Sequence, residues 1–397
     1  MNLRSAAAFA AVGVGLVLVP NLRDATGFPI YLLVFLYSTF YWITQATSWN
    51  ILSGYSGYFS FGQSAFAGTG LYATAILAGE YDVNFFLAVP LAGVVSMLLA
   101  LGVGFVAFRL RSLRGEIFTL LTFVVAFVLA AVAQLSTFID GGQGRALTQP
   151  DYPSFLGTYN DLIYRMGAVA AVVAVAVAYA IQHSRLGRGL FAIRDDEDVA
   201  EALGTPTFRY KMIAFAISGF LAGAAGGMNA LQVSYLTTDT VFNFIVPLFV
   251  ILMSTLGGRQ HWLGPVIGAV LIFALQERLA GAGFSSVSQI LLGAVLALTI
   301  LFVPEGLYTR LRDRWRLALT LFVLTIAAQE AVSAFDSVLA RFFLALVVVL
   351  PFLVVSPRLL AGLGWFAPRR PVVRDGRPPL SQGAVGSPPE DAKAVSS

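Results

Sequence analysis

The stretch from Arg185 to Lys211, RLGRGLFAIRDDEDVAEALGTPTFRYK, decides how this chain is organised, because it is a charged segment between two long apolar ones. Residues 162–181 precede it and residues 212–235 follow it, and both runs are mostly apolar. A helix of about 20 apolar residues crosses the ~30 Å hydrocarbon core of a bilayer. The pattern therefore predicts a short water-exposed element held between two membrane-spanning helices.

The composition of the whole chain also indicates a membrane protein. Of its 397 residues, 58% are hydrophobic and 12% are charged, whereas about a quarter of the residues in a soluble domain are charged. Too few polar residues remain to cover a water-facing surface, so we expect the lipid bilayer to be the solvent. The chain has no cysteine and only two histidines, His183 and His261, so we expect no metal site and no catalytic residues.

Apolar windows predict an all-α, polytopic transmembrane helix bundle of about 10–12 spans. Glycines make the region around residues 50–70 the least regular, and broken helices are tolerated in a membrane only where protein or a water-filled path surrounds them. The expected spans are residues 3–20, 28–49, 58–79, 83–108, 116–138, 162–181, 212–235, 241–256, 262–280, 285–303, 316–333 and 338–356.

The distribution of positive charge predicts the orientation in the membrane. With the N-terminus inside, 20 of the 25 Lys and Arg residues fall on the cytoplasmic side. Because cytoplasmic loops carry an excess of Lys and Arg, we predict a multi-pass protein of the cytoplasmic (inner) membrane with both termini in the cytoplasm. The net charge of +4 then requires no nucleic-acid partner. A secretory signal peptide is the alternative for the first residues, but no small-residue cleavage site follows them.

Ionisable residues are scarce at the centres of the expected spans. Glu277, Arg278 and Glu330 lie near outer ends, and Arg114 and Glu116 flank an inner end. Ion-coupled carriers commonly place a charged residue inside a span, so the pattern argues against ion coupling and favours energy supplied from outside the membrane. The chain also lacks a Gly-x-x-x-x-Gly-Lys-Ser/Thr phosphate loop, so we expect it not to hydrolyse ATP by itself.

The acidic run at residues 195–198 predicts the start of a helix within the charged segment. Carboxylates at a helix N-terminus cap free N–H groups and complement the helix dipole. Val199 and Leu203 then form a small apolar stripe, and Gly204 and Pro206 end the helix after about two turns. So short a helix must pack against its own protein or against a partner, while a solvated loop with one capped turn is the alternative.

Two motifs in this segment carry a family resemblance. Glu201-Ala202-Leu203-Gly204 resembles the Glu-Ala-Ala…Gly loop of ABC-transporter membrane subunits, and residues 184–211 as a whole resemble the permeases of branched-chain amino acid ABC importers. That family includes permeases for urea and short amides. The resemblance implies a coupling helix seated in a groove of an ATPase subunit. Its implied contact residues are Arg194, Asp195, Asp196, Glu197, Val199, Ala200, Glu201, Leu203 and Gly204.

The glycine-rich stretch at residues 49–72 resembles the same family, with departures at Phe61 and at Gln63, where the family often has His. Its neutral polar groups could contact a zwitterionic or amide solute in passing, while tight helix packing is the alternative. The candidate translocation-path residues are Gly54, Tyr55, Gly57, Ser60, Gly62, Gln63 and Ser64.

Two further glycine motifs match the family. Gly141, Gly142 and Gly144 begin the longest external loop, which the resemblance implies would face an extracytoplasmic binding protein. The glycines of residues 256–269 indicate either a half-helix junction or a close helix crossing. The resemblance covers roughly residues 30–310. We therefore divide the chain into an N-terminal segment (1–29), a permease core (30–315), two additional spans (316–360) and a disordered cytoplasmic tail (361–397).

The resemblance implies a permease subunit that moves branched-chain amino acids by ATPase-driven alternating access. Its implied partners are a second homologous permease, two cytoplasmic ABC ATPases that bind ATP, an extracytoplasmic solute-binding protein and the lipid bilayer. No cofactor is expected on this chain. The alternatives are a urea or short-amide permease and an ion-coupled secondary carrier, and the permease pair is either homodimeric or heterodimeric.

Overall fold

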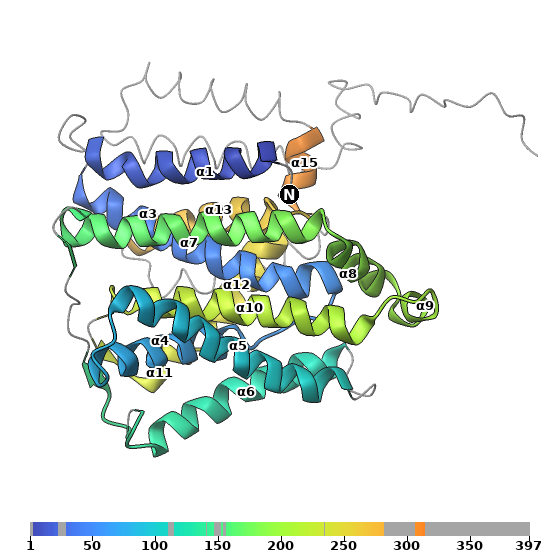
Figure 1. The fold of residues 1–397 in the computed structure, drawn as a ribbon, viewed down its shortest axis with the longest axis horizontal. Coiled ribbons are helices and arrows are strands. Elements are labelled where there is room, and N and C mark those ends of the chain that lie inside the picture. The colour runs from blue at the N-terminus through green and yellow to red at the C-terminus, as the bar shows by residue number, and fades with distance from the viewer. Residues whose placement is uncertain are drawn as a thin grey trace, which may run out of the picture. The chain divides into compact units, whose positions relative to one another are not determined.

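The computed structural model describes residues 3–22, 29–109, 115–139, 141–146, 152–153, 156–233, 235–281 and 306–313. Helices account for most of this part of the chain, so the predicted all-α polytopic bundle is confirmed (Figure 1). The helices are α1 (Leu3–Leu18), η1 (Val19–Leu22), α3 (Ile30–Trp49), η2 (Asn50–Gly54), α4 (Gln63–Gly79), α5 (Phe85–Arg109), α6 (Glu116–Leu135), α7 (Tyr159–Gln182), α8 (Arg185–Asp195), α9 (Glu197–Ala202), α10 (Thr207–Asn229), α11 (Thr238–Val241), α12 (Ile245–Gly257), α13 (Gly264–Gly281) and α15 (Leu307–Asp313).

Each of the first nine expected spans contains a helix. Six helical segments of the described chain are long and apolar enough to cross a membrane: Arg4–Asn21, Phe85–Arg109, Glu116–Leu135, Tyr159–Gln182, Thr207–Asn229 and Thr238–Gly257. The expected spans at 285–303, 316–333 and 338–356, and the expected tail at 361–397, lie outside the described residues.

Two of the expected helix starts were wrong. The span expected at 58–79 begins as a helix only at Gln63, because residues 57–62 are not helical. The span expected at 212–235 begins at Thr207, directly after Pro206. Proline is tolerated at the start of a helix but not in its interior, so Pro206 sets this boundary and brings Lys211 into the helix.

Helix α10 lies at the centre of the described bundle, between α4 and α5 on one side and α3 and α7 on the other (Figure 1). Glycines let its backbone touch that of α4. A Cβ atom on Gly70 would overlap the backbone of Gly223, and one on Gly226 would overlap the backbone of Ala67. Small residues at such crossings replace the hydrophobic driving force that is missing between helices in lipid.

Helices α12 and α13 cross even more closely. A Cβ atom on Gly268 would overlap the carbonyl oxygen of Met253, and one on Gly257 would overlap that of Gly264. The glycines of residues 256–269 therefore make a close helix crossing at the turn between two helices.

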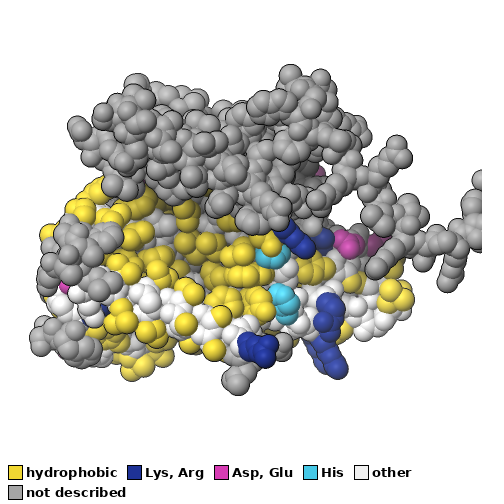
Figure 2. All heavy atoms as spheres, turned by 90° about the horizontal axis from the view of Figure 1, so that it is seen from above, with side chains coloured by type: hydrophobic (Ala, Val, Ile, Leu, Met, Phe, Trp, Pro, Cys, Tyr) yellow, Lys and Arg dark blue, Asp and Glu magenta, His cyan; other side chains and the backbone are white. Residues whose placement is uncertain are grey.

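The side chains of the bundle divide by type along its length. Hydrophobic side chains cover the described part of the flank in Figure 2, and charged and histidine side chains gather toward the end that carries α8 and α9 in Figure 1. Exposed apolar residues on α5 and α6 include Leu98, Leu120, Phe127 and Val128. An apolar flank with polar ends is the arrangement that a bilayer requires.

Candidate functional site

The chain leaves helical geometry between Ser56 and Gln63, and we call residues 57–62 the unwound segment. Its backbone groups bond to side chains of neighbouring helices. The Trp49 indole N–H donates to the carbonyl of Ser60 at 2.7 Å, and the N–H of Phe61 donates to Oγ1 of Thr122 at 3.0 Å. Irregular backbone at membrane depth is tolerated where protein satisfies its polar groups, so these bonds are what permit the interruption.

A network of neutral amides and hydroxyls lies at the start of α4. The side-chain N–H groups of Gln63 donate to Oε1 of Gln45 at 2.7 Å and to Oγ of Ser48 at 2.6 Å. Gln45 in turn donates to the carbonyl of Ala222 on α10 at 3.3 Å. Gln63 is therefore a buried amide that joins α4 to α3, and Gln45 continues the network to α10.

The candidate path residues come together in this region, and most of them are buried. Gly54, Tyr55, Ser60, Gln63 and Ser64 are all inaccessible to solvent or nearly so. Gly62 is buried as well, and Gly57 is partly exposed. Among the described residues, three buried polar atoms in this region have no hydrogen-bond partner: Oγ1 of Thr47, Nδ2 of Asn50 and Oγ of Ser64.

The predicted helix in the charged segment is present as α9. Asp196 is its N-cap, and the Asp196 carboxylate accepts hydrogen bonds from the N–H groups of Asp198 and Val199, both at 3.0 Å. Gly204, with φ of 86°, follows the helix in the left-handed conformation that glycine adopts without strain. The prediction of a capped helix of this length is confirmed.

Helix α9 has a buried face and an exposed apolar face. Ala200 is 3% exposed and packs on the bundle, whereas Val199 is 55% exposed and Leu203 is 82% exposed. The implied contacts Asp195, Asp196, Glu201 and Gly204 are also exposed. The apolar stripe read from the sequence therefore points away from the protein.

Helix α8 was not predicted. Its signal was present in Ser184, whose hydroxyl oxygen accepts a hydrogen bond from the N–H of Gly187 at 3.3 Å and caps the helix. Leu186, Leu190 and Ile193 follow at helical spacing, and the last two are buried. Together α8 and α9 form an elbow between the C-terminal end of α7 and the N-terminal end of α10 (Figure 1).

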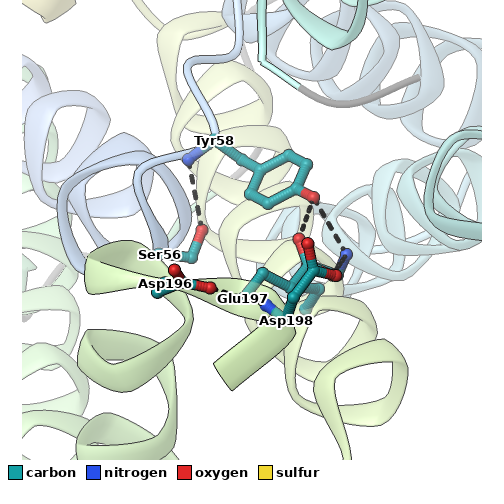
Figure 3. A network of polar contacts seen from close by, with 6 residues as sticks. Ser56, Tyr58, Asp196, Glu197 and Asp198 are labelled. Carbon is teal, nitrogen blue, oxygen red and sulfur yellow. Dashed lines mark hydrogen bonds and ion pairs between the residues drawn. The ribbon is translucent and has the colours of Figure 1, made fainter. Parts of the chain in front are cut away.

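Three polar side chains from distant parts of the chain meet beneath α9, and we call them the Tyr58–Glu197–Lys211 cluster. The Lys211 ammonium lies 2.6 Å from Oε1 of Glu197 and 3.1 Å from the hydroxyl oxygen of Tyr58. The Tyr58 hydroxyl also donates to the other carboxylate oxygen of Glu197 (Figure 3). The side chain of Lys211 is 3% exposed and that of Glu197 is 11% exposed.

Aromatic rings surround the Lys211 ammonium. It lies 4.5 Å from the ring centroid of Tyr58 and 5.1 Å from that of Phe108. Sequence reasoning placed Lys211 among the basic residues of the inner interface and gave Tyr58 no role. No sequence spacing could have joined them, because Tyr58 and Lys211 are 153 positions apart.

A second contact between the elbow and the unwound segment lies beside this cluster. Gly57 has φ of 78°, and a Cβ atom there would lie 2.9 Å from Cγ of Arg194 at the end of α8. The Arg259 guanidinium, in the turn between α12 and α13, lies 5.1 Å from the ring centroid of Phe59. Burial and then the charge of Arg194 lower the pKa of Arg259.

The glycines predicted to begin an external loop lie at the end of the bundle opposite α9 (Figure 1). Gly141, Gly142 and Gly144 all have positive φ, of 61°, 72° and 80°. A Cβ atom on Gly144 would lie 2.5 Å from the hydroxyl oxygen of Tyr235. Strand β1 (Arg145–Ala146) pairs antiparallel with β2 (Tyr235–Leu236), so the loop has a defined conformation at Gly144. Its contact with a binding protein stays a prediction.

The comparisons with known proteins agree with this architecture. The protein family described as branched-chain amino acid transport system, permease component, matches residues 31–300. The high-affinity branched-chain amino acid transport system permease protein LivM of Salmonella typhimurium is 26% identical over 304 residues, which are 70% of each chain. No solved structure matches this chain.

Other relatives carry different names. The ribose import permease protein RbsC of Escherichia coli is 29% identical over 141 residues, or 34% of this chain and 44% of that protein. The probable branched-chain amino acid transport permease protein LivH of Methanocaldococcus jannaschii is 20% identical over 264 residues, or 62% of this chain and 82% of that protein.

Fold and relatives together define a multi-pass membrane permease of the ABC importer class. The chain belongs to the family of branched-chain amino acid transport system permease components, because that family matches more than half of its length. The resemblance seen in residues 184–211 is thereby confirmed.

Proposed function

We propose that this permease moves branched-chain amino acids across the cytoplasmic membrane by ATPase-driven alternating access. The family description and the similarity to LivM over 70% of the chain support this solute. The similarity to RbsC is shorter and supports ribose less. In the cell, the permease would work with a second homologous permease, two cytoplasmic ATPases that bind ATP and an extracytoplasmic solute-binding protein.

The exposed apolar face of α9 carries the proposal. Val199 and Leu203 are exposed on a capped helix whose other face is fixed to the bundle. Exposed apolar groups beside an acidic helix N-terminus suit a protein groove better than water. We assign α9 to the ATPase groove, with the exposed members of the implied contact set around it: Asp195, Asp196, Val199, Glu201, Leu203 and Gly204. The basic end of the bundle, which includes Arg185 and Arg188, would then face the cytoplasm.

The unwound segment and the start of α4 form the proposed translocation path. Its groups are neutral, as a zwitterionic amino acid with an apolar side chain requires. The unpartnered polar atoms of Thr47, Asn50 and Ser64 support this role. Each buried polar atom without a partner costs about 1–3 kcal/mol, and a passing solute would supply the missing partner in another conformation. Gly141, Gly142 and Gly144 would face the binding protein at the outer end.

Uptake by the complete transporter in proteoliposomes tests this function. The permease pair, both ATPases and the binding protein are reconstituted, and labelled leucine, urea and ribose are offered with and without ATP on the ATPase side. We expect ATP-dependent leucine uptake that an uncoupler does not reduce. ATP-dependent urea or ribose uptake without leucine uptake would change the solute, and uptake by the permease alone that collapses with an uncoupler would identify a secondary carrier.

Docking of α9 can be tested separately. The chain has no native cysteine, so a single Leu203→Cys change provides one thiol on the exposed face for cross-linking to a cysteine placed in the ATPase groove. We expect a specific permease–ATPase product, and we expect Leu203→Asp to reduce ATPase co-purification. Unchanged co-purification and no cross-link would contradict the assignment of α9.

A further inference from the structure

The Tyr58–Glu197–Lys211 cluster joins three elements: α9, α10 and the unwound segment. Glu197 is the first residue of α9, Lys211 lies in the second turn of α10, and Tyr58 belongs to the unwound segment. Both carboxylate oxygens of Glu197 are used within this chain, one by Lys211 and the other by Tyr58. The carboxylate therefore faces the permease itself, away from the surface that α9 presents to a partner.

Because the cluster is buried, its charged side chains resist separation. An ammonium and a carboxylate removed from water are each unfavourable alone, so separating them leaves an uncompensated buried charge. The Tyr58 hydroxyl is part of the same balance, because it bonds to both charged groups. A displacement of α9 relative to α10 would separate the two charges, and a displacement of α9 relative to the unwound segment would break the bond between Tyr58 and the Glu197 carboxylate.

The unwound segment is held by the elbow at two consecutive residues. Gly57 packs against the side chain of Arg194 in α8, and Tyr58 bonds to Glu197 in α9. The backbone at Gly57 is outside any helix and has positive φ, which is a conformation that glycine enters and leaves at little cost. The elbow of α8 and α9 therefore contacts the proposed path at Gly57 and Tyr58, where the backbone is easiest to deform.

We propose that the Tyr58–Glu197–Lys211 cluster transmits the movement of α9 to the translocation path. In this role Glu197 is a positioning residue inside the permease, and it is not a contact for the ATPase. When the ATPases displace α9, the cluster moves Tyr58 with it, and the unwound segment rearranges around Gly57 and the start of α4. This inference rests on the proposed docking of α9 to an ATPase.

The test uses the complete reconstituted transporter with three readouts: ATPase co-purification, ATP hydrolysis and leucine uptake. The cluster variants are Glu197→Gln, Lys211→Met and Tyr58→Phe. Matched controls remove an equal charge from exposed neighbours, with Asp198→Asn on α9 and Arg209→Gln on α10. We expect Glu197→Gln and Lys211→Met to keep the ATPases bound and hydrolysing while uptake falls at least tenfold. Tyr58→Phe should reduce uptake severalfold, and the controls should retain it.

A double variant covers the case in which a single change prevents folding. Glu197→Gln with Lys211→Met removes both charges and leaves side chains of similar size, and such replacements of buried ion pairs are often tolerated. We expect this protein to fold, to bind the ATPases and to transport at least tenfold more slowly. Uptake at the unaltered level would overturn the proposal, because the charged contact would then have no part in transport.

One further outcome separates this inference from the proposed function. Loss of ATPase co-purification in Glu197→Gln alone, with normal uptake in Lys211→Met and Tyr58→Phe, would make Glu197 an ATPase contact. Transmission through the cluster would then be wrong, while docking of α9 would stand. If the unaltered transporter showed no ATP-dependent leucine uptake, the proposed function itself would be contradicted.

Discussion

Two glycine-rich regions of this permease use the same residue for opposite purposes. At the crossing of α12 and α13, Gly257 and Gly268 let two regular helices touch backbone to backbone. In the unwound segment, Gly57 lets the chain leave helical geometry, and side chains such as Trp49 and Thr122 satisfy the freed backbone groups. Glycine in an apolar sequence therefore indicates either rigid packing or an interrupted helix. Neighbouring hydrogen-bonding side chains distinguish the two.

The largest expected effect is at the crossing. Gly268→Val places side-chain atoms where the carbonyl of Met253 lies, and a backbone group cannot move aside as a side chain can. We expect a loss of about 3 kcal/mol or more of stability, seen as low yield and a lower unfolding temperature in detergent. Gly102→Val on α5 is the matched control, because a Cβ atom there meets nothing within 4 Å. Equal stability of the two variants would show that the crossing is loosely packed.

A smaller loss is expected where the unwound segment bonds to α6. Thr122→Val removes the acceptor of the Phe61 N–H and leaves this partly buried donor without a partner, at about 1 kcal/mol. Thr255→Val on α12 is the control, because the Thr255 hydroxyl bonds, within the described part of the chain, to carbonyls of its own helix alone. Thermal unfolding of the purified variants measures both. Equal effects would mean that the segment does not depend on side-chain partners.

Gly57→Ala tests the deformable point of the proposed path. Its φ of 78° costs a residue with a Cβ atom about 1–2 kcal/mol, and Cγ of Arg194 would also have to move. We expect modest destabilisation with a larger loss of leucine uptake, and partial recovery in Gly57→Asn, since asparagine enters this conformation more readily. Normal uptake by Gly57→Ala would show that this backbone conformation is not needed for transport.

The smallest effect concerns pH at the turn between α12 and α13. Burial first, and then the charges of Arg312 and His183, lower the pKa of His261 from about 6.5 to about 4. The folded protein therefore favours neutral His261, and this contribution to stability is full above pH 6.5 and lost progressively as the pH falls toward 4. His261→Gln should show a smaller decrease in unfolding temperature between pH 7 and pH 5. An identical pH profile would place His261 in an ordinary solvated environment.

Much of the fold follows from local sequence. Long apolar windows predicted the helices, and the carboxylate run with Gly204 and Pro206 predicted α9 because caps act within a few residues. The start of α4 could not be read this way. Residues 58–62 are as apolar as a membrane span. Hydrogen bonds from Trp49 and from α6 to the backbone carbonyls of these residues stabilise the irregular conformation there.

The candidate site was also predictable only in part from the sequence. Glycines, serines and Gln63 identified the region of the proposed path, but the partners of Gln63 on α3 were not predictable from spacing. Lys211 seemed an ordinary interfacial cation in the sequence, because nothing near it in the chain offers a carboxylate at helical spacing on α10.

The sequence by itself determined that this chain is a helical membrane protein with a short capped helix in its charged segment, because apolar run lengths, charge bias and capping are local properties, and the family resemblance of residues 184–211 added the permease class. Only the tertiary structure decided that this helix is tied to the unwound segment. Tyr58 and Glu197 are 139 positions apart, and they meet because the packing of α4, α5 and α10 brings the unwound segment beneath α9. Burial of Lys211 at that meeting point then makes the contact between them stiff.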